Sequence, residues 1–187
     1  MKNEALIRFF DITFSFFGIV IFMPIFFTIY LYLFFTSRSP LFLQKRVGKN
    51  ERVFTLVKFR SMDIKTISVP THEIQNPCIT KFGNFLRKTK LDEIPQLYNV
   101  FVGHMSIVGP RPGLIDHNEL IIARRKFNIY SVKPGITGLS QVNKIDMSNP
   151  KKLAESDLEM ISDFNLKKYF IYIFLTILGN GFGDRVK

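Results

Sequence analysis

The chain has 187 residues, which is enough for one domain with a buried core and too short for two full domains. A net charge of +11 indicates an anionic partner, while 47% hydrophobic residues, including 21 phenylalanines, exceed the needs of a soluble basic domain and point to a lipid bilayer. One cysteine, Cys78, excludes an intramolecular disulfide and a cysteine-based metal cluster.

Residues 12–35 form an uncharged apolar run that is long enough for a straight helix to cross a bilayer. Pro24 lies in the middle of this run, where it removes a hydrogen bond and bends a helix. Lysines and arginines lie on both sides, and the positive-inside rule therefore favours both ends in the cytoplasm. We expect residues 1–36 to form a membrane-inserted, re-entrant helix kinked at Pro24. A spanning helix is the alternative, and a cleaved signal peptide fits less well because the run is too long.

Short elements of mixed type follow this run. The patterns predict a strand at residues 53–62, a basic helix at 79–90 and a second helix at 95–102. Residues 62–77 have no regular period and contain two prolines, which predicts a long loop over the site. Residues 153–178 are predicted to form one helix, whose uncharged part from residue 169 lies at the membrane interface or packs on the core.

Asp92 and Glu93 are adjacent carboxylates just ahead of the helix that Pro95 is predicted to begin. Acidic residues at helix starts are most often caps. A helix N-terminus also stabilises a bound phosphate, and the neighbouring cations suit the same ligand. An ionised Asp92 could attack an activated phosphorus or bind a metal ion, and the cations favour that ionised form. Cations precede the pair at Arg87, Lys88 and Lys90.

Other basic residues allow the same two interpretations. Strand alternation places Lys58 and Arg60 on one face, either as a solvated surface or as a grip for a diphosphate. Two prolines stiffen the turn at residues 109–113 around Arg111, which suits phosphate recognition, although a surface turn is the alternative. A glycine-bearing turn at 133–138 precedes the amides of residues 141–143 and is a weak signal alone. The histidines have no metal-binding spacing, and neither a GxGxxG nor a P-loop motif occurs.

Several of these motifs are linked in the order found in one family. From about Arg8 to Thr176 the chain resembles the small bacterial sugar transferases, the monotopic phosphoglycosyl transferases. The resemblance implies a re-entrant membrane helix, interfacial amphipathic helices and a small cytoplasmic α/β catalytic domain over residues 37–187, at the bacterial inner membrane. The motifs that carry it are Lys58-Phe59-Arg60-Ser61-Met62, Leu91-Asp92-Glu93, Pro95-Gln96-Leu97-Tyr98-Asn99-Val100, Gly109-Pro110-Arg111-Pro112, residues 133–138, Gln141-Val142-Asn143 and Asp157.

The same resemblance implies a reaction. A sugar-1-phosphate moves from a UDP-sugar to a polyprenol phosphate with release of UMP, as the first membrane step of O-antigen, capsule or glycoprotein glycan assembly. By analogy with small members, the sugar is expected to be N-acetylated. Asp92 would be the nucleophile and a ligand of Mg²⁺, and Glu93 its helper. Arg87 and Arg111 would hold phosphates, while further family positions at or near the site are Lys58, Arg60, Gln96 and Asp157.

One departure from the family concerns the membrane helix. Many members have serine before the kink proline, whereas Met23 precedes Pro24 here. A rival function is a non-enzymatic, membrane-anchored basic module that binds anionic lipid or nucleic acid through residues 38–60. Such a module has no need of Asp92 and Glu93, and the chain lacks aromatic-flanked basic motifs of known type. The sequence therefore favours the enzyme, without a nucleic-acid partner.

Overall fold

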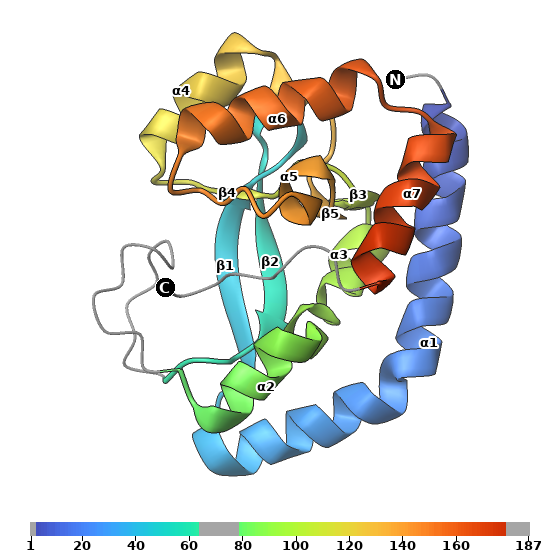
Figure 1. The fold of residues 1–187 in the computed structure, drawn as a ribbon. Coiled ribbons are helices and arrows are strands. Elements are labelled where there is room, and N and C mark those ends of the chain that lie inside the picture. The colour runs from blue at the N-terminus through green and yellow to red at the C-terminus, as the bar shows by residue number, and fades with distance from the viewer. Residues whose placement is uncertain (1–2, 64–78, 179–187) are drawn as a thin grey trace.

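The computed structural model describes residues 3–63 and 79–178. Two long strands cross the middle of the molecule, and helices surround them, with α1 along one side and the lower edge (Figure 1). An antiparallel sheet has the order β2-β1-β4, and β3 pairs in parallel with β5. The predicted α-rich α/β class is confirmed. The strands are β1 Leu41–Val47, β2 Val53–Phe59, β3 Ser106–Val108, β4 Gly113–Leu114 and β5 Gly135–Thr137. The α-helices are α1 Glu4–Ser37, α2 Lys81–Thr89, α3 Gln96–Phe101, α4 Asn118–Lys126, α5 Leu139–Val142, α6 Pro150–Ser162 and α7 Leu166–Ile177, and the short 3₁₀ turns are η1 Lys49–Glu51, η3 Leu91–Glu93 and η4 Ile129–Ser131.

Helix α1 is long and apolar enough to cross a membrane by its length and composition. It contains Pro24 and bends partway along its course (Figure 1). Proline has no N–H to donate to the carbonyl of Val20, and its ring crowds that carbonyl, so the helix bends away from it. Thr28 Oγ1 donates to the carbonyl oxygen of Pro24 at 2.9 Å on the following turn. Pro24 therefore accounts for the bend by itself, although Met23 stands where many family members have serine.

Both halves of α1 pack against the same body of the protein. In the first half, Ile7 lies in a cluster with Tyr169 of α7 and Val108 of β3. In the second half, Ile29 and Leu33 are buried in another cluster that includes residues of β2 and α2. An ion pair of 2.7 Å joins Glu4 Oε1, in the first turn of the helix, to Nζ of Lys49 in η1. The folded domain thus holds α1 from its first turn to its last.

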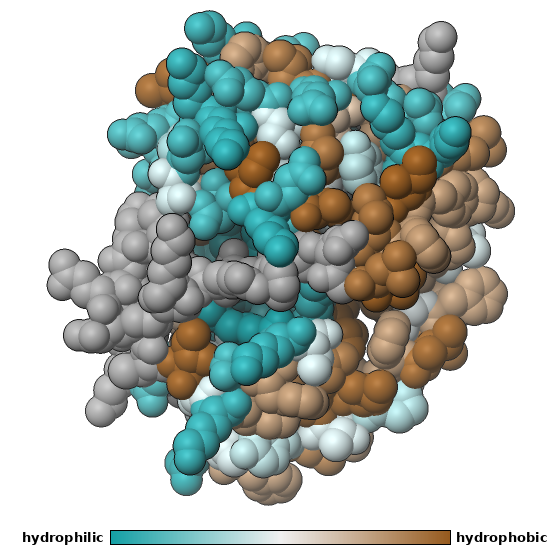
Figure 2. All heavy atoms as spheres, viewed as in Figure 1, coloured by the Kyte–Doolittle hydropathy of each residue, from teal (hydrophilic) through white to brown (hydrophobic). Residues whose placement is uncertain are grey.

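The outward side of α1 is apolar and exposed. Apolar side chains gather over α1 and α7, whereas hydrophilic ones cover α4 and α6 (Figure 2). Folded proteins that remain monomeric in water rarely expose a continuous apolar face of this extent. The face therefore suits contact with a membrane. Its most exposed members on these helices are Phe9, Phe17, Ile21, Met23, Phe27, Phe35, Phe174 and Ile177.

Most predicted elements are found in the structure, with one correction. The strand at β2 and the helices at α2 and α3 are confirmed, although each is shorter than predicted. The single helix predicted at 153–178 is wrong, because α6 ends at Ser162 and α7 begins at Leu166. The side chain of Asn165 accepts a hydrogen bond from Lys168 N at 3.1 Å and caps the second helix. The predicted loop at 62–77 lies mostly outside the described residues, and the division into 1–36 and 37–187 stays a prediction.

Candidate active site

Asp92 and Glu93 lie in η3, the helical turn between α2 and α3. Lys90 has a left-handed conformation with φ of 59° and turns the chain from α2 into η3. Backbone bonds from Glu93 N to Lys90 O, at 3.1 Å, and from Leu97 N to the oxygen of Ile94, at 3.0 Å, continue the turns into α3. Helix α3 has Pro95 at its N-cap and no side-chain cap. The N-cap position of α3 is thus occupied by Pro95 and not by Asp92 or Glu93.

The structure brings Glu93 together with Arg111. Nη2 of Arg111 lies 3.4 Å from Glu93 Oε1, and the two side chains are only 18% and 14% exposed. Asp92, the preceding residue, is itself buried at 7% exposure. Arg111 follows β3 in the proline-bounded turn, where Gly109 N donates to the carbonyl of Thr137 in β5 at 2.8 Å. The pairing of β3 with β5 thus presents Arg111 to Glu93.

Two adjoining hollows share Glu93 and Arg111 in their walls. The narrower one also contains Lys58 and Gln96, so four predicted site residues meet there. The larger has a volume of about 250 Å³ and reaches from the charged pair to Phe22 of α1. The larger pocket thus lies between the Glu93–Arg111 pair and the apolar helix α1. The remaining residues of the larger pocket are Thr89, Lys90, Leu91, Ile94, Leu97, Ile136, Thr137, Gln141 and Thr176.

Lys58 and Arg60 share one face of the β1–β2 hairpin, as strand alternation predicts. Both cations lie over the ring of Phe42, at 5.4 Å and 5.5 Å from its centroid. Lys58 lines the narrow hollow beside Glu93. Arg60 instead donates from Nε to the carbonyl oxygen of Ser39 at 2.9 Å and from Nη2 to its hydroxyl at 3.0 Å. These contacts of Arg60 tie the end of β2 to the segment that follows α1.

Arg87 lies on α2 and contacts the segment that follows β2. Its Nε donates to Ser61 Oγ at 2.8 Å. This bond orients the guanidinium from α2 toward the end of the strand that carries Lys58. The structure thus places a third predicted cation on a helix that leads directly into η3.

Asp157 is enclosed by its partners in this structure, and its predicted place at or near the site stays a prediction. It is fully buried in α6, where Oδ2 accepts from Nε and Nη2 of Arg124 at 3.0 Å and 2.7 Å. Oδ1 accepts from Ser140 Oγ at 2.9 Å. A carboxylate enclosed by these partners is not open to a substrate. Asp157 instead holds α5, and Gln141 on α5 reaches the larger pocket.

Three residues of the site region were missed or left unassigned by sequence reasoning. Lys90 lines the larger pocket, and burial lowers its pKa; Glu93 opposes this shift and Arg111 adds to it. Arg46 lines the narrow hollow and donates from Nη1 to the carbonyl of Pro112 at 2.9 Å. Gln141 belongs to an amide motif that is weak by itself. The period of two that places Gln44 and Arg46 on one face of β1 was a usable signal for the buried arginine.

The carboxylates of the site would hold Mg²⁺ only if a substrate phosphate supplied further ligands. Within residues 3–63 and 79–178, no group of three or more histidine, cysteine, aspartate or glutamate side chains is placed to hold a metal ion. Mg²⁺, however, usually takes one or two carboxylates and completes its shell with water and substrate phosphates. Glu93 offers one such carboxylate beside Arg111, whereas Asp92, which precedes it in the same turn, lines neither of the two hollows in this structure.

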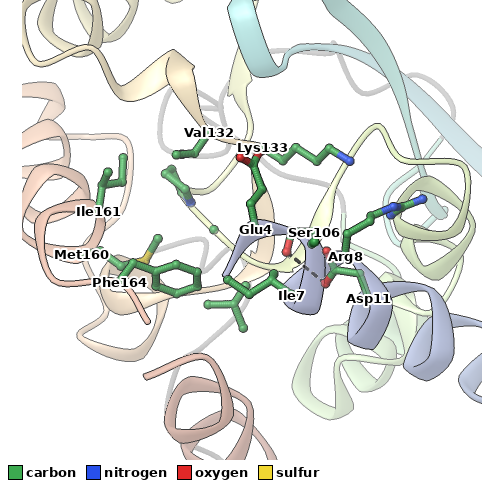
Figure 3. A pocket seen from close by; sticks show the side chains of 14 residues that line it. Glu4, Ile7, Arg8, Asp11, Ser106, Val132, Lys133, Met160, Ile161 and Phe164 are labelled. Atoms are coloured by element: carbon green, nitrogen blue, oxygen red, sulfur yellow. Dashed lines mark hydrogen bonds between the residues drawn. The ribbon is translucent and has the colours of Figure 1, made fainter. Parts of the chain in front are cut away.

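A separate pocket of about 210 Å³ lies between the first turns of α1, β3 and α6 (Figure 3). Asp11 of α1 is buried at its edge and accepts from Ser106 Oγ at 3.0 Å and from Tyr169 OH at 2.9 Å. Arg8 donates to the carbonyls of Val100 and Phe101 at 2.7 Å and 2.9 Å, at the C-terminal end of α3. These contacts hold the first half of α1 against the elements that carry the site.

Known proteins resemble this chain over most of its length. Residues 2–180 match the family model described as bacterial sugar transferase. The UDP-glucose:undecaprenyl-phosphate glucose-1-phosphate transferase of Escherichia coli (strain K12) is 38% identical over 185 residues, covering 94% of this chain and 40% of the relative. The protein of the same name from Xanthomonas campestris pv. campestris is 42% identical over 145 residues, covering 70% and 29%. The exopolysaccharide production protein PSS of Rhizobium leguminosarum bv. phaseoli is 34% identical over 196 residues, covering 94% and 97%.

The chain thus spans less than half of the first two relatives and nearly the whole of the third. The family match covers almost every residue, and it includes the turn with Asp92 and Glu93, the arginine turn and the bent apolar helix. This chain belongs to the bacterial sugar transferase family.

Proposed function

We propose that the protein is a phosphoglycosyl transferase, which moves a sugar-1-phosphate from a UDP-sugar to a polyprenol phosphate such as undecaprenyl phosphate. The observation that carries this proposal is the pocket that runs from Glu93 and Arg111 to Phe22 of the apolar helix. Such a pocket can hold a phosphate at one end beside a lipid at the other. The names of the E. coli and Xanthomonas relatives, which are UDP-glucose:undecaprenyl-phosphate glucose-1-phosphate transferases, support the same reaction.

The chemistry proceeds in two displacements at one phosphorus atom. A carboxylate oxygen of Asp92 attacks the phosphorus that bears the sugar, and the bond from that phosphorus to the bridging oxygen breaks, so UMP leaves with the electron pair. An oxygen of the polyprenol phosphate then attacks the same phosphorus, and the bond to Asp92 breaks to restore the carboxylate. Covalent catalysis of this kind divides one difficult transfer into two easier ones.

Other residues supply charge and orientation. Arg111 and Lys90 face the transferred phosphoryl group and stabilise its negative charge, which is where most such catalysis resides. Glu93 accepts the proton of the acceptor phosphate when that group is still protonated. Mg²⁺, held by Asp92 and Glu93 when bound, supplies further neutralisation of phosphate charge. Lys58 and Gln96 line the adjoining hollow and bind outer parts of the UDP-sugar. Arg87, which lines neither hollow in this structure, is proposed to hold phosphate from α2.

The proposed location is the cytoplasmic face of the bacterial inner membrane, with α1 re-entrant. Its support is that α1 contacts one folded body along both halves and that Glu4 pairs with Lys49. A straight spanning helix would carry its two ends to opposite sides of the bilayer. The bend at Pro24 and the exposed apolar side of the helix fit entry and exit by one face.

The relatives guide the choice of sugar for the first assay. Those from E. coli and Xanthomonas are named for glucose, and a Streptococcus agalactiae relative that is 35% identical over 159 residues is named a galactosyl transferase. UDP-glucose and UDP-galactose are therefore tested first, beside UDP-N-acetylglucosamine and a deoxy N-acetylated donor. The expectation of an N-acetylated sugar stays a prediction for that panel.

The experiment is release of UMP by purified protein in lipid nanodiscs with Mg²⁺, each UDP-sugar, and undecaprenyl phosphate present or omitted. The proposal predicts UMP and a lipid-linked diphosphosugar for at least one donor. Absence of both products with every donor would overturn it. Lipid binding that weakens with salt and survives replacement of Asp92 and Glu93 would then support a non-enzymatic basic module.

A further inference from the structure

Phe22 is the residue that α1 contributes to the wall of the larger pocket, which Glu93 and Arg111 also line. One helical turn earlier, on the same face of α1, Gly18 approaches α3 closely, since a Cβ built on it would lie only 3.0 Å from Leu97 Cδ1. Leu97 lines the pocket as well. The close approach of α1 to α3 at Gly18 thus brings the ring of Phe22 to the pocket.

The wall of this pocket divides into a charged part and a hydrocarbon part. Glu93 and Arg111 form their ion pair of 3.4 Å in the first part. Phe22, Ile94 and Leu97 belong to the second, and their side chains offer neither a donor nor an acceptor of hydrogen bonds. A ligand that fills the pocket therefore needs an anionic group directly beside a hydrocarbon group.

The hydrocarbon part of the pocket continues into the outer face of α1. The side chain of Phe22 is 38% exposed, and its neighbours Ile21 and Met23 are 67% and 56% exposed. These residues belong to the apolar surface that gathers over α1 (Figure 2). A hydrocarbon chain that leaves the pocket past Phe22 reaches this surface. A sugar or nucleoside in the same place would lose the hydrogen bonds of its polar groups to water without replacement.

We propose that Phe22 is a specificity-determining residue, which contacts the first isoprene units of the polyprenol phosphate and selects this lipid over phosphates with a straight saturated chain. This inference rests on the proposed function and adds recognition of the acceptor lipid to it. Methyl branches and double bonds make an isoprene unit broader and stiffer than a run of methylenes. A hydrophobic pocket distinguishes ligands that differ by one methylene by about 10-fold or more, so walls formed by Phe22 and Leu97 can distinguish these chains.

The test compares Phe22→Ala with Phe27→Ala, each in lipid nanodiscs. Phe27 is 60% exposed on the same helix and lines neither hollow, so both variants remove one ring from α1 and only Phe22→Ala alters the pocket. We expect Phe22→Ala to raise KM for undecaprenyl phosphate by about 10-fold and to leave KM for the UDP-sugar unchanged. Phe27→Ala should leave both values close to those of the wild-type protein.

Short acceptors test whether Phe22 reads the shape of the chain. Farnesyl phosphate and dodecyl phosphate have main chains of equal length, but only farnesyl phosphate is branched and unsaturated. Wild-type protein should use farnesyl phosphate with a kcat/KM at least about 10-fold higher. Phe22→Ala should lose most of this preference, whereas Phe27→Ala should keep it.

The first displacement separates lipid recognition from a structural role of Phe22. The burst of UMP that precedes addition of the acceptor uses no lipid, so its rate should be the same in Phe22→Ala and in the wild-type protein. A slower burst would overturn the inference, because the ring would then serve the fold or the UDP-sugar. An equal rise of KM in both variants, or a preference for farnesyl phosphate that Phe22→Ala retains, would also overturn it.

Failure of the proposed function gives a different pattern. Binding of radiolabelled farnesyl phosphate, in competition with dodecyl phosphate, is measured without UDP-sugar. Wild-type protein that prefers farnesyl phosphate in a Phe22-dependent way but releases no UMP would overturn the transferase and retain the contact. Wild-type protein that releases UMP and uses both acceptors equally would overturn the contact and retain the transferase.

Discussion

Arg124 and Asp157 form an ion pair inside the protein, with Nη2 and Oδ2 2.7 Å apart and side-chain exposures of 2% and 0%. The pair joins α4 to α6, and Asp157 also accepts from Ser140 of α5. A residue that matches a family position is thereby part of the support behind the site. Asp157 thereby holds α5, which carries Gln141 to the wall of the larger pocket.

Asp157→Asn should destabilise the fold. The substitution leaves the Arg124 charge buried without its carboxylate, and breaking a buried pair in this way costs roughly 3–5 kcal/mol of unfolding free energy. Denaturant unfolding in detergent micelles measures the change. Glu51→Gln, at the exposed pair with Arg125, is the control and should leave the midpoint nearly unchanged. A variant with native stability but a raised KM would show that Asp157 acts on the substrate directly.

Asp92→Asn should abolish turnover, with a loss of at least about 10³-fold in kcat, because an amide cannot serve as the attacking carboxylate. UMP release from a UDP-sugar measures this loss. Membrane association should persist, since α1 is unchanged, and flotation with liposomes checks it. Asp163→Asn, an exposed acid at the end of α6, provides the control with near-normal activity. Retained turnover in Asp92→Asn would rule out this residue as the nucleophile.

Gly135→Ala should displace the turn that carries Arg111. A Cβ at this position would lie 2.0 Å from Gly109 N and 2.6 Å from the carbonyl carbon of Val108, and backbone atoms cannot rotate aside. We expect a loss of about 1–3 kcal/mol in unfolding free energy, as for other overpacked sites. Activity should fall by at least about 10-fold, because Arg111 would be displaced from its position beside Glu93.

Gly113→Ala tests whether that loss is specific. Gly113 lies on the turn that carries Arg111, but a Cβ added there would meet only the ends of two side chains, each at 3.3 Å. Thermal unfolding and UMP release should change less than in Gly135→Ala. Equal effects of the two substitutions would mean that the approach of β3 to β5 does not position Arg111.

Lys90→Met should raise the free energy of unfolding and at the same time weaken the use of the UDP-sugar. Burial lowers the pKa of Lys90 below its ordinary 10.5, so the folded state holds this proton less firmly than the unfolded state. The charged lysine therefore opposes folding at neutral pH, and this cost fades as pH rises through the folded pKa toward 10.5. The stability gain from methionine should be largest near neutral pH and shrink in alkali, while KM for the UDP-sugar rises.

Unfolding by urea at several pH values checks the stability gain, and Lys88→Met, at an exposed neighbour, is the control that should leave the free energy of unfolding nearly unchanged. A gain that stays constant up to pH 10.5 would contradict the role assigned to the buried charge.

The topology of α1 is open to cysteine labelling. In a Cys78→Ser background, Ala5→Cys and Lys45→Cys each place an exposed thiol at one end of the helix. If the helix is re-entrant, a membrane-impermeant maleimide should label both thiols in inverted vesicles, whose outer surface is the cytoplasmic face of the membrane. It should label neither thiol in right-side-out vesicles. Labelling of the two positions from opposite sides would establish a spanning helix.

Local features of the chain were predictable because they depend on neighbours in sequence. The apolar run with Pro24 predicted a bent helix, and strand alternation predicted the shared face of Lys58 and Arg60, which both lie over Phe42. The single helix from 153 to 178 failed, since apolar content on both sides concealed the cap at Asn165. A few polar residues barely change the hydrophobic pattern of a long segment, but their side chains can bond the backbone and begin a new helix.

The sequence by itself determined the family, the bent apolar helix and the place of Asp92 and Glu93 just ahead of a helix, all of which are carried by residues close together in the chain. Only the tertiary structure decided that Arg111 faces Glu93, that Asp157 is enclosed by Arg124, and that Gln141 reaches the pocket. The physical reason is that side-chain encounters between distant segments depend on how strands pair and helices pack. Motif spacing records which residues are present, and packing decides which of them meet.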